Sequence, residues 1–67
     1  MRLKQLRAGS GYTQKSVASL LGVNQSTVAL WETGKTMPRA SLLPRIAKLY
    51  NCTVDELLMP DDSELTT

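Results

Sequence analysis

Three residues, Gly22, Val23 and Asn24, are all that separates two segments in which apolar residues recur at helical spacing. We expect helices over about residues 14–21 and 25–32. A connection this short cannot let the second helix run back along the first, so the chain must turn sharply between them. Two helices joined at roughly 90 to 120° by a short turn containing Gly form a helix-turn-helix. The sequence therefore predicts this motif near its centre.

The residues that flank the two central segments are typical of helix ends. Thr13 and Asn24 precede them, and each side chain is expected to cap the helix that follows. Gly22 and Gly34 come after them and can adopt the left-handed conformation that ends a helix. These positions predict where both central helices begin and end.

Three further helices are predicted outside this pair. The first covers about residues 2–8. The fourth begins near Ser41, because Pro44 is tolerated only in a first turn, where its missing N–H costs nothing. The fifth opens at Thr53, which forms a capping box with Glu56.

The chain is short enough for one domain at most, and it shows no alternating strand pattern. Hydrophobic residues make up 42%, with no Phe, so the core must be largely aliphatic. We expect an all-α, compact five-helix domain over residues 1–59. Residues 60–67, which hold one Leu without a partner, are expected to be a short, disordered acidic tail.

Charge is distributed unevenly along the chain. All eight basic residues lie in residues 1–50, with Glu32 as the single acid there. The other five acids lie in residues 51–67, which contain no Lys or Arg. A basic body points to a polyanion as partner. Small domains often carry uneven surface charge, however, so charge alone leaves the partner open.

Several classes of function lack the residues that they need. No apolar run is long enough to span a membrane and no signal peptide is present, so we expect a cytoplasmic protein. With no His and with Cys52 as the only Cys, neither a metal site nor an activated nucleophile is expected. The sequence predicts no cofactor, no catalytic residue and no enzyme activity.

The predicted third helix has an unusual outward face. On a helical wheel Val28 and Trp31 point to the core, whereas Gln25, Ser26 and Ala29 point away from it. The DNA major groove is about 12 Å wide, and a bulky face would hold a helix off its floor. Gln can form a bidentate bond to adenine, Ser reaches several base edges, and Ala can touch a thymine methyl. An ordinary amphipathic helix with a Ser- and Thr-rich surface is the alternative.

Over roughly residues 2–59 the chain resembles the Cro and phage-repressor type of helix-turn-helix family, also called lambda-repressor-like. The resemblance rests on "TQKSVASLLGV", "WETGKT" and "VDELL". It implies a sequence-specific regulator of transcription, expected to be a repressor, that binds double-stranded DNA.

The resemblance also implies roles for individual positions. The expected base contacts are Gln25, Ser26, Ala29 and Leu30. The expected DNA-backbone contacts are Gln14, Asn24, Thr27, Lys35, Thr36 and Arg39. Gln14 is expected to brace Gln25 as well, and Arg7 and Glu32 match the family's internal ion pair.

Two positions depart from the family's pattern. Leu30 stands where a polar residue is more common, so it either contacts a thymine methyl or lies on the rim of the groove. Leu20 is apolar where the family is commonly polar, which leaves open what covers it.

One recognition helix reads only a few base pairs, so specificity calls for a homodimer on a roughly palindromic site with half-sites about 34 Å apart. The expected dimer surface is Leu57, Leu58 and Met59, unless Leu57 and Leu58 both pack internally. The alternative function is an antitoxin or accessory protein-interaction module with the same fold. DNA binding that falls steeply with salt distinguishes the two.

Overall fold

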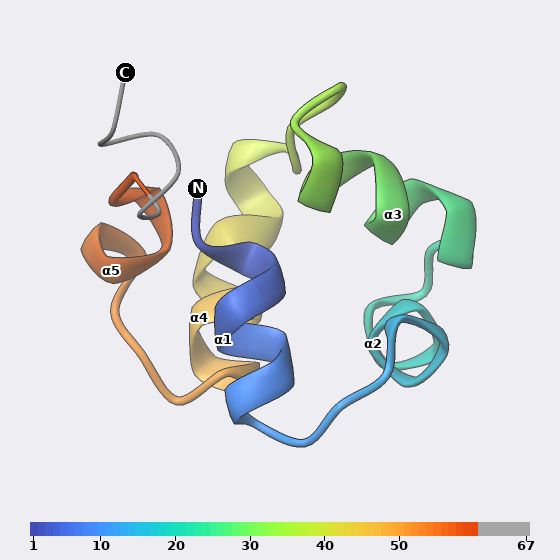
Figure 1. The fold of residues 1–67 in the computed structure, drawn as a ribbon, viewed down its shortest axis with the longest axis horizontal. Coiled ribbons are helices and arrows are strands. Elements are labelled where there is room, and N and C mark those ends of the chain that lie inside the picture. Colours follow the sequence, from blue (N-terminus) through green and yellow to red (C-terminus); the bar gives the residue numbers. More distant parts are fainter. Residues whose placement is uncertain (61–67) are drawn as a thin grey trace.

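The computed structural model describes residues 1–60, which form five α-helices and one 3-10 turn and contain no strand (Figure 1). The elements are α1 (Leu3–Gly9), α2 (Gln14–Leu21), α3 (Gln25–Thr33), η1 (Ala40–Leu42), α4 (Leu43–Leu49) and α5 (Val54–Leu58). The predicted all-α, five-helix class is confirmed for these residues. Apart from Pro60, the predicted acidic tail lies outside the described part of the chain.

Capping boxes open two of the helices. The Thr13 hydroxyl accepts a hydrogen bond from the Ser16 amide at 3.0 Å, and the Ser16 hydroxyl accepts one from the Thr13 amide at 2.9 Å. Thr53 and Glu56 form the same reciprocal pair at the start of α5. Both predicted caps are therefore confirmed.

The predicted cap at Asn24 is wrong in its chemistry, though not in its position. Asn24 is the N-cap residue of α3 and has the expected extended backbone, but its side chain forms no capping bond. Its carbonyl oxygen accepts from the Thr27 amide at 3.0 Å instead. No side chain therefore covers the amide groups that open α3.

Glycine ends both central helices. Gly22 has φ +73° and Gly34 has φ +82°, in the left-handed region that side-chain-bearing residues rarely adopt. A Cβ added at either position would meet no atom within 4 Å, so conformation and not space requires glycine. Beyond Gly22, the Val23 amide donates to Ala18 O at 2.9 Å and closes the turn into α3.

The core is a single apolar cluster to which every helix contributes. Its buried members are Leu3, Val17, Ala18, Leu21, Val28, Trp31, Leu42, Ile46, Ala47, Tyr50 and Leu57. Ala18 has the smallest of the side chains that α2 contributes to this core. The inward positions of Val28 and Trp31 leave the opposite face of α3 turned outward.

The structure divides the predicted dimer surface. Leu57 has no exposed surface at all, so its assignment to an interface is wrong: it is a core residue. Leu58 is 46% exposed and Met59 is 51% exposed. The side chain of Leu57 points into the core cluster, whereas position 58 is rotated by about 100° around the helix toward the surface.

The helices lie in three groups along the longest axis of the molecule. Figure 1 shows α2 and α3 at one end, α5 at the other, and α1 and α4 between them. The N-terminus lies beside α5, where the Arg2 amide donates to Leu57 O at 3.2 Å. Both ends of the described chain are therefore remote from α3.

Alkaline stability should depend on Tyr50. Burial, and to a smaller extent the charge of Glu32, raises the pKa of Tyr50 to about 12. An unfolded tyrosine titrates near pH 10, so this group contributes stability that is complete below pH 10 and is lost as pH rises toward 12. We expect Tyr50→Phe to lose less stability than the wild type between pH 8 and pH 11 in urea denaturation. Equal losses in the two proteins would contradict this.

Candidate nucleic-acid interface

The outward face of α3 consists of short, uncharged side chains. Gln25 and Ser26 open the helix and are exposed, and Ala29 lies one turn further along, half-buried. Leu30 is exposed beside them. These four predicted base-contacting positions therefore share the side of α3 that Val28 and Trp31 leave free, and no charged side chain interrupts it.

The loop after α3 carries several of the predicted backbone contacts. Lys35, Thr36 and Arg39 are exposed there. The amides of Lys35 and Thr36 both donate to Leu30 O, at 3.1 and 3.4 Å, so the loop folds back onto the end of the helix. Its cations are thus held close to the C-terminal part of α3.

The two polar positions at the start of α3 differ in exposure. Asn24 is exposed and, without a capping role, its side chain is available to an outside partner. Thr27 is half-buried, on the flank of the helix.

Gln14 is held by α3, but not through the residue that was expected. Its side-chain amide donates to Glu32 Oε1 at 3.0 Å. The predicted brace to Gln25 is therefore replaced by one to the last turn of α3. The half-buried Gln14 keeps a second amide hydrogen, because an amide nitrogen carries two.

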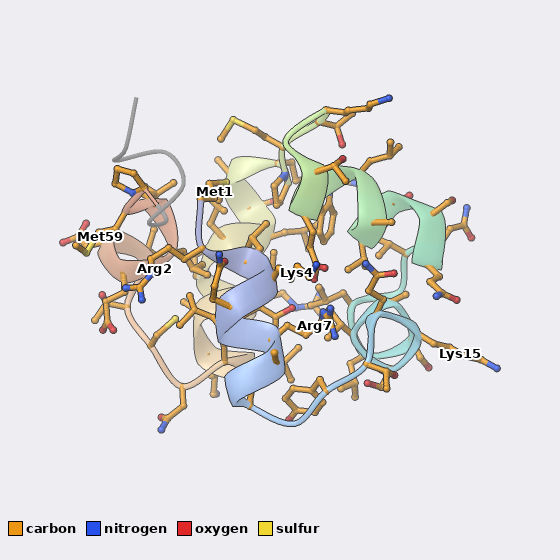
Figure 2. The ribbon with its side chains drawn as sticks, in the orientation of Figure 1. Met1, Arg2, Lys4, Arg7, Lys15 and Met59 are labelled. Atoms are coloured by element: carbon orange, nitrogen blue, oxygen red, sulfur yellow. The ribbon has the colours of Figure 1, made fainter. Side chains whose placement is uncertain are left out.

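The Glu32 carboxylate also receives Arg7. Arg7 Nε lies 2.6 Å from Glu32 Oε2, and Arg7 Nη2 donates to Glu32 Oε1 at 3.2 Å, which reproduces the predicted ion pair. Only 3% of the Glu32 side chain is exposed. The bond to Glu32 raises the pKa of Arg7, and Arg7 Nη1 donates to Tyr12 O at 2.9 Å. Figure 2 shows Arg7 reaching from α1 toward α2 and α3.

Neither α2 nor α3 has an acidic residue in its own first turn to interact with the positive end of its helix dipole. Lys15 lies in the first turn of α2, is exposed, and projects away from the domain (Figure 2). A cation there is unfavourable unless an anion binds nearby. Lys15 was not among the DNA contacts expected from the sequence, although a cation in the first turn of a helix is unfavourable and can be recognised from the sequence.

Apart from the largely buried Glu32, the described acids lie far from this surface. Asp55 and Glu56 are on α5, at the opposite end of the molecule from α2 and α3 (Figure 1). The surface formed by the outward side of α3, the start of α2 and the loop of residues 34–39 therefore combines neutral hydrogen-bonding groups with cations. Such a surface suits a nucleic acid.

Comparison with known proteins agrees with this geometry. The family model described as "Helix-turn-helix" matches residues 3–57, which is most of the chain. The chain belongs to this Cro/C1-type helix-turn-helix family of DNA-binding regulators of transcription, whose members are not enzymes. The predicted family is thus confirmed.

Relatives of this chain are named as regulators of transcription. An uncharacterized HTH-type transcriptional regulator of Archaeoglobus fulgidus is 36% identical over 96% of this chain and 91% of its own length. The HTH-type transcriptional activator BcrR of Enterococcus faecalis is 38% identical over 91% of this chain, which spans only 30% of BcrR. The HTH-type transcriptional regulator ImmR of Bacillus subtilis is 34% identical, and the chain spans 48% of it. No solved structure matches.

Residues 1–60 show neither a membrane-spanning helix nor a cluster of metal ligands. No helix among them is long and apolar enough to cross a membrane. No three His, Cys, Asp or Glu side chains in the same range gather into a metal site. Cys52 is free and half-buried, and burial raises the pKa of its thiol.

Removing the Glu32 carboxylate should destabilise the fold. We expect Glu32→Gln to lower the free energy of unfolding by about 2 kcal/mol, because the part-buried Arg7 guanidinium loses its counter-charge. Urea denaturation at neutral pH measures this. The double variant Arg7→Met, Glu32→Leu should recover part of the loss, since it leaves no charge unpaired. A loss below 0.5 kcal/mol, about that of an ordinary surface substitution, would show that the pair contributes little.

Proposed function

We propose that this chain is a cytoplasmic, sequence-specific repressor of transcription that binds a palindromic operator as a homodimer, with α3 in the major groove. The observation that carries this proposal is the small, neutral, exposed face of α3, with Lys15 at the start of α2 and Lys35 and Arg39 in the loop after α3. Ordinary solvation does not call for such a face. A helix that must approach base edges closely does.

Base reading is assigned to the first turns of α3. Gln25 can donate to adenine N7 and accept from adenine N6 through one side-chain amide. Ser26 reaches a neighbouring base edge, and the Ala29 methyl is small enough to meet a thymine methyl. Leu30, at the edge of the same face, supplies a further apolar contact to thymine.

Phosphate binding is assigned to the two sides of α3. Gln14, held by Glu32, turns its remaining amide hydrogen toward a phosphate at the start of α2, and Lys15 adds charge there. Lys35, Thr36 and Arg39 contact the backbone on the other side, and Asn24 and Thr27 contact it at the start of α3. These contacts position the protein without reading sequence.

We infer a homodimer because one recognition helix contacts only a few base pairs. Two copies place two α3 helices in successive major grooves about 34 Å apart and double the sequence that is read. The exposed Leu58 and Met59, on the side remote from α3, are available for the contact between copies. Because BcrR is named an activator, the sign of regulation is tested separately, with a reporter gene downstream of the selected operator.

Gln25→Ala should cost about 1–3 kcal/mol in binding to the cognate site and should relax base preference at one position in each half-site. Selection of bound sequences from a random duplex pool, followed by titration of the best site, measures both effects. Ser19→Ala, an exposed serine on α2 outside the interface, is the matched control. Equal weakening on all sequences would identify Gln25 as a backbone contact instead.

Lys35→Ala should weaken binding about equally on all sequences and should reduce the slope of log K against log salt by about one unit, because one fewer counterion is released. Titrations between 50 and 200 mM salt measure the slope. Lys4→Ala, on α1, removes the same charge outside the proposed interface and should keep the slope. If Lys35→Ala also keeps it, the loop does not reach the phosphates.

A further inference from the structure

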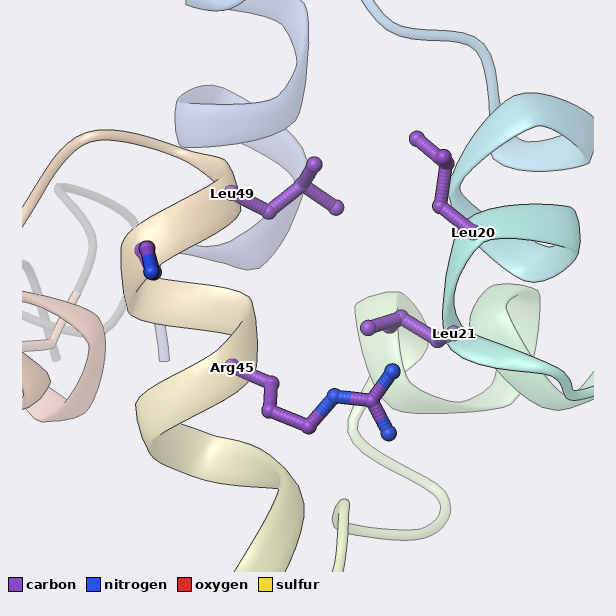
Figure 3. Close-up of a pocket in the computed structure, with 5 residues that line it drawn as sticks. Leu20, Leu21, Arg45 and Leu49 are labelled. Carbon is purple, nitrogen blue, oxygen red and sulfur yellow. The ribbon is translucent and has the colours of Figure 1, made fainter.

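A hollow of about 360 Å³ lies between α2 and α4, away from the proposed base-reading face. Its lining consists of Leu20, Leu21, Arg45, Lys48 and Leu49. Figure 3 shows the leucines of α2 and α4 facing one another across the hollow, with the Arg45 guanidinium reaching toward α2. We call this the α2/α4 groove.

The groove combines an open apolar floor with unpaired positive charge. Leu20 is 53% exposed, although a leucine could be buried at little cost, and Leu49 is half-buried beside it. Arg45 and Lys48 are exposed and form no ion pair within residues 1–60. A ligand that fits would supply apolar side chains together with a carboxylate.

The end of α5 has the matching chemistry. Leu58 and Met59 are about half exposed, and the exposed Asp55 lies one turn before them. The neighbouring Glu56 carboxylate is occupied in the capping box with Thr53, which leaves Asp55 as the free acid of this helix. Figure 2 shows Met59 at the outer edge of the molecule.

This end of α5 cannot enter the groove of its own chain. In Figure 1, α4 stands between α5 and α2, and α5 packs on the side of α4 that faces away from α2. The complementary partner must therefore come from another molecule.

We propose that the α2/α4 groove receives the Leu58 and Met59 side chains of a second copy of this chain, with Asp55 of that copy facing Arg45 and Lys48. This inference rests on the proposed homodimer and names its contact. In a two-fold pair each copy presents both surfaces, so two equal contacts form. Leu20, the apolar residue left without a role by the DNA interface, is covered in this dimer.

Substitutions that reverse the charges on the two surfaces test the contact. We expect the double variant Arg45→Glu, Lys48→Glu to weaken self-association about tenfold or more in sedimentation equilibrium without DNA, because repulsion replaces attraction. Asp55→Lys should weaken it as well. A chain with all three substitutions, or an equimolar mixture of the two variants, should regain a large part of the affinity.

Apolar variants provide a second test, since a lysine in the first turn of α5 opposes the helix dipole and could disturb the helix itself. Leu20→Gln and Leu58→Gln alter exposed side chains on the two surfaces, and each should weaken the dimer. Met37→Gln, an exposed apolar residue outside both, should not. Circular dichroism of each variant checks that the helices are retained.

The outcomes separate this contact from other arrangements. A direct contact between the two α5 helices would respond to Leu58→Gln but not to Leu20→Gln or to the Arg45 and Lys48 changes, and would overturn the proposal. Wild type that stays monomeric at millimolar concentration would also overturn it. Neither result bears on the proposed contacts between α3 and the bases. The loss of affinity that Gln25→Ala causes can still be measured with monomeric protein on a single half-site.

Discussion

The largely buried Glu32 carboxylate joins α1, α2 and α3, which include both helices of the helix-turn-helix. Glu32, in the last turns of α3, accepts hydrogen bonds from Arg7 of α1 and Gln14 of α2. A buried carboxylate without donors would be costly, so the three side chains must occupy these positions together. The bond to Gln14 ties the start of α2 to α3, and the bond to Arg7 ties both to the rest of the core. The orientation of α3 relative to α1 and α2 therefore depends on this cluster as well as on apolar packing.

Local signals predicted the backbone of the domain well. The cap at Thr13, the capping box at Thr53 and the left-handed glycines at positions 22 and 34 involve residues only a few positions apart, so the sequence contains the whole interaction. The outward face of α3 was predictable for the same reason, because helical period alone separates Val28 from Gln25.

Side-chain partners across the fold were harder to predict. Gln14 bonds Glu32 and not Gln25, and Asn24 forms no cap, because each has several donors and acceptors and tertiary distance decides among them. Leu57 and Leu58 are chemically identical neighbours, and only the direction in which α5 packs on α4 makes one a core residue and the other a surface residue. Lys15 was overlooked because a lone lysine in a helix is unremarkable until the missing acid in its first turn is considered.

The hydrogen bond between the Arg2 amide and Leu57 O brings the beginning of the chain against its last helix. Extra polypeptide joined at Met1 would begin beside α5, with α1 and α4 between that point and α3 (Figure 1). The outward face of α3 is therefore remote from a module, such as a sensor or a fluorescent tag, that is joined at Met1. This geometry makes the domain suitable as an exchangeable targeting unit in chimeric regulators.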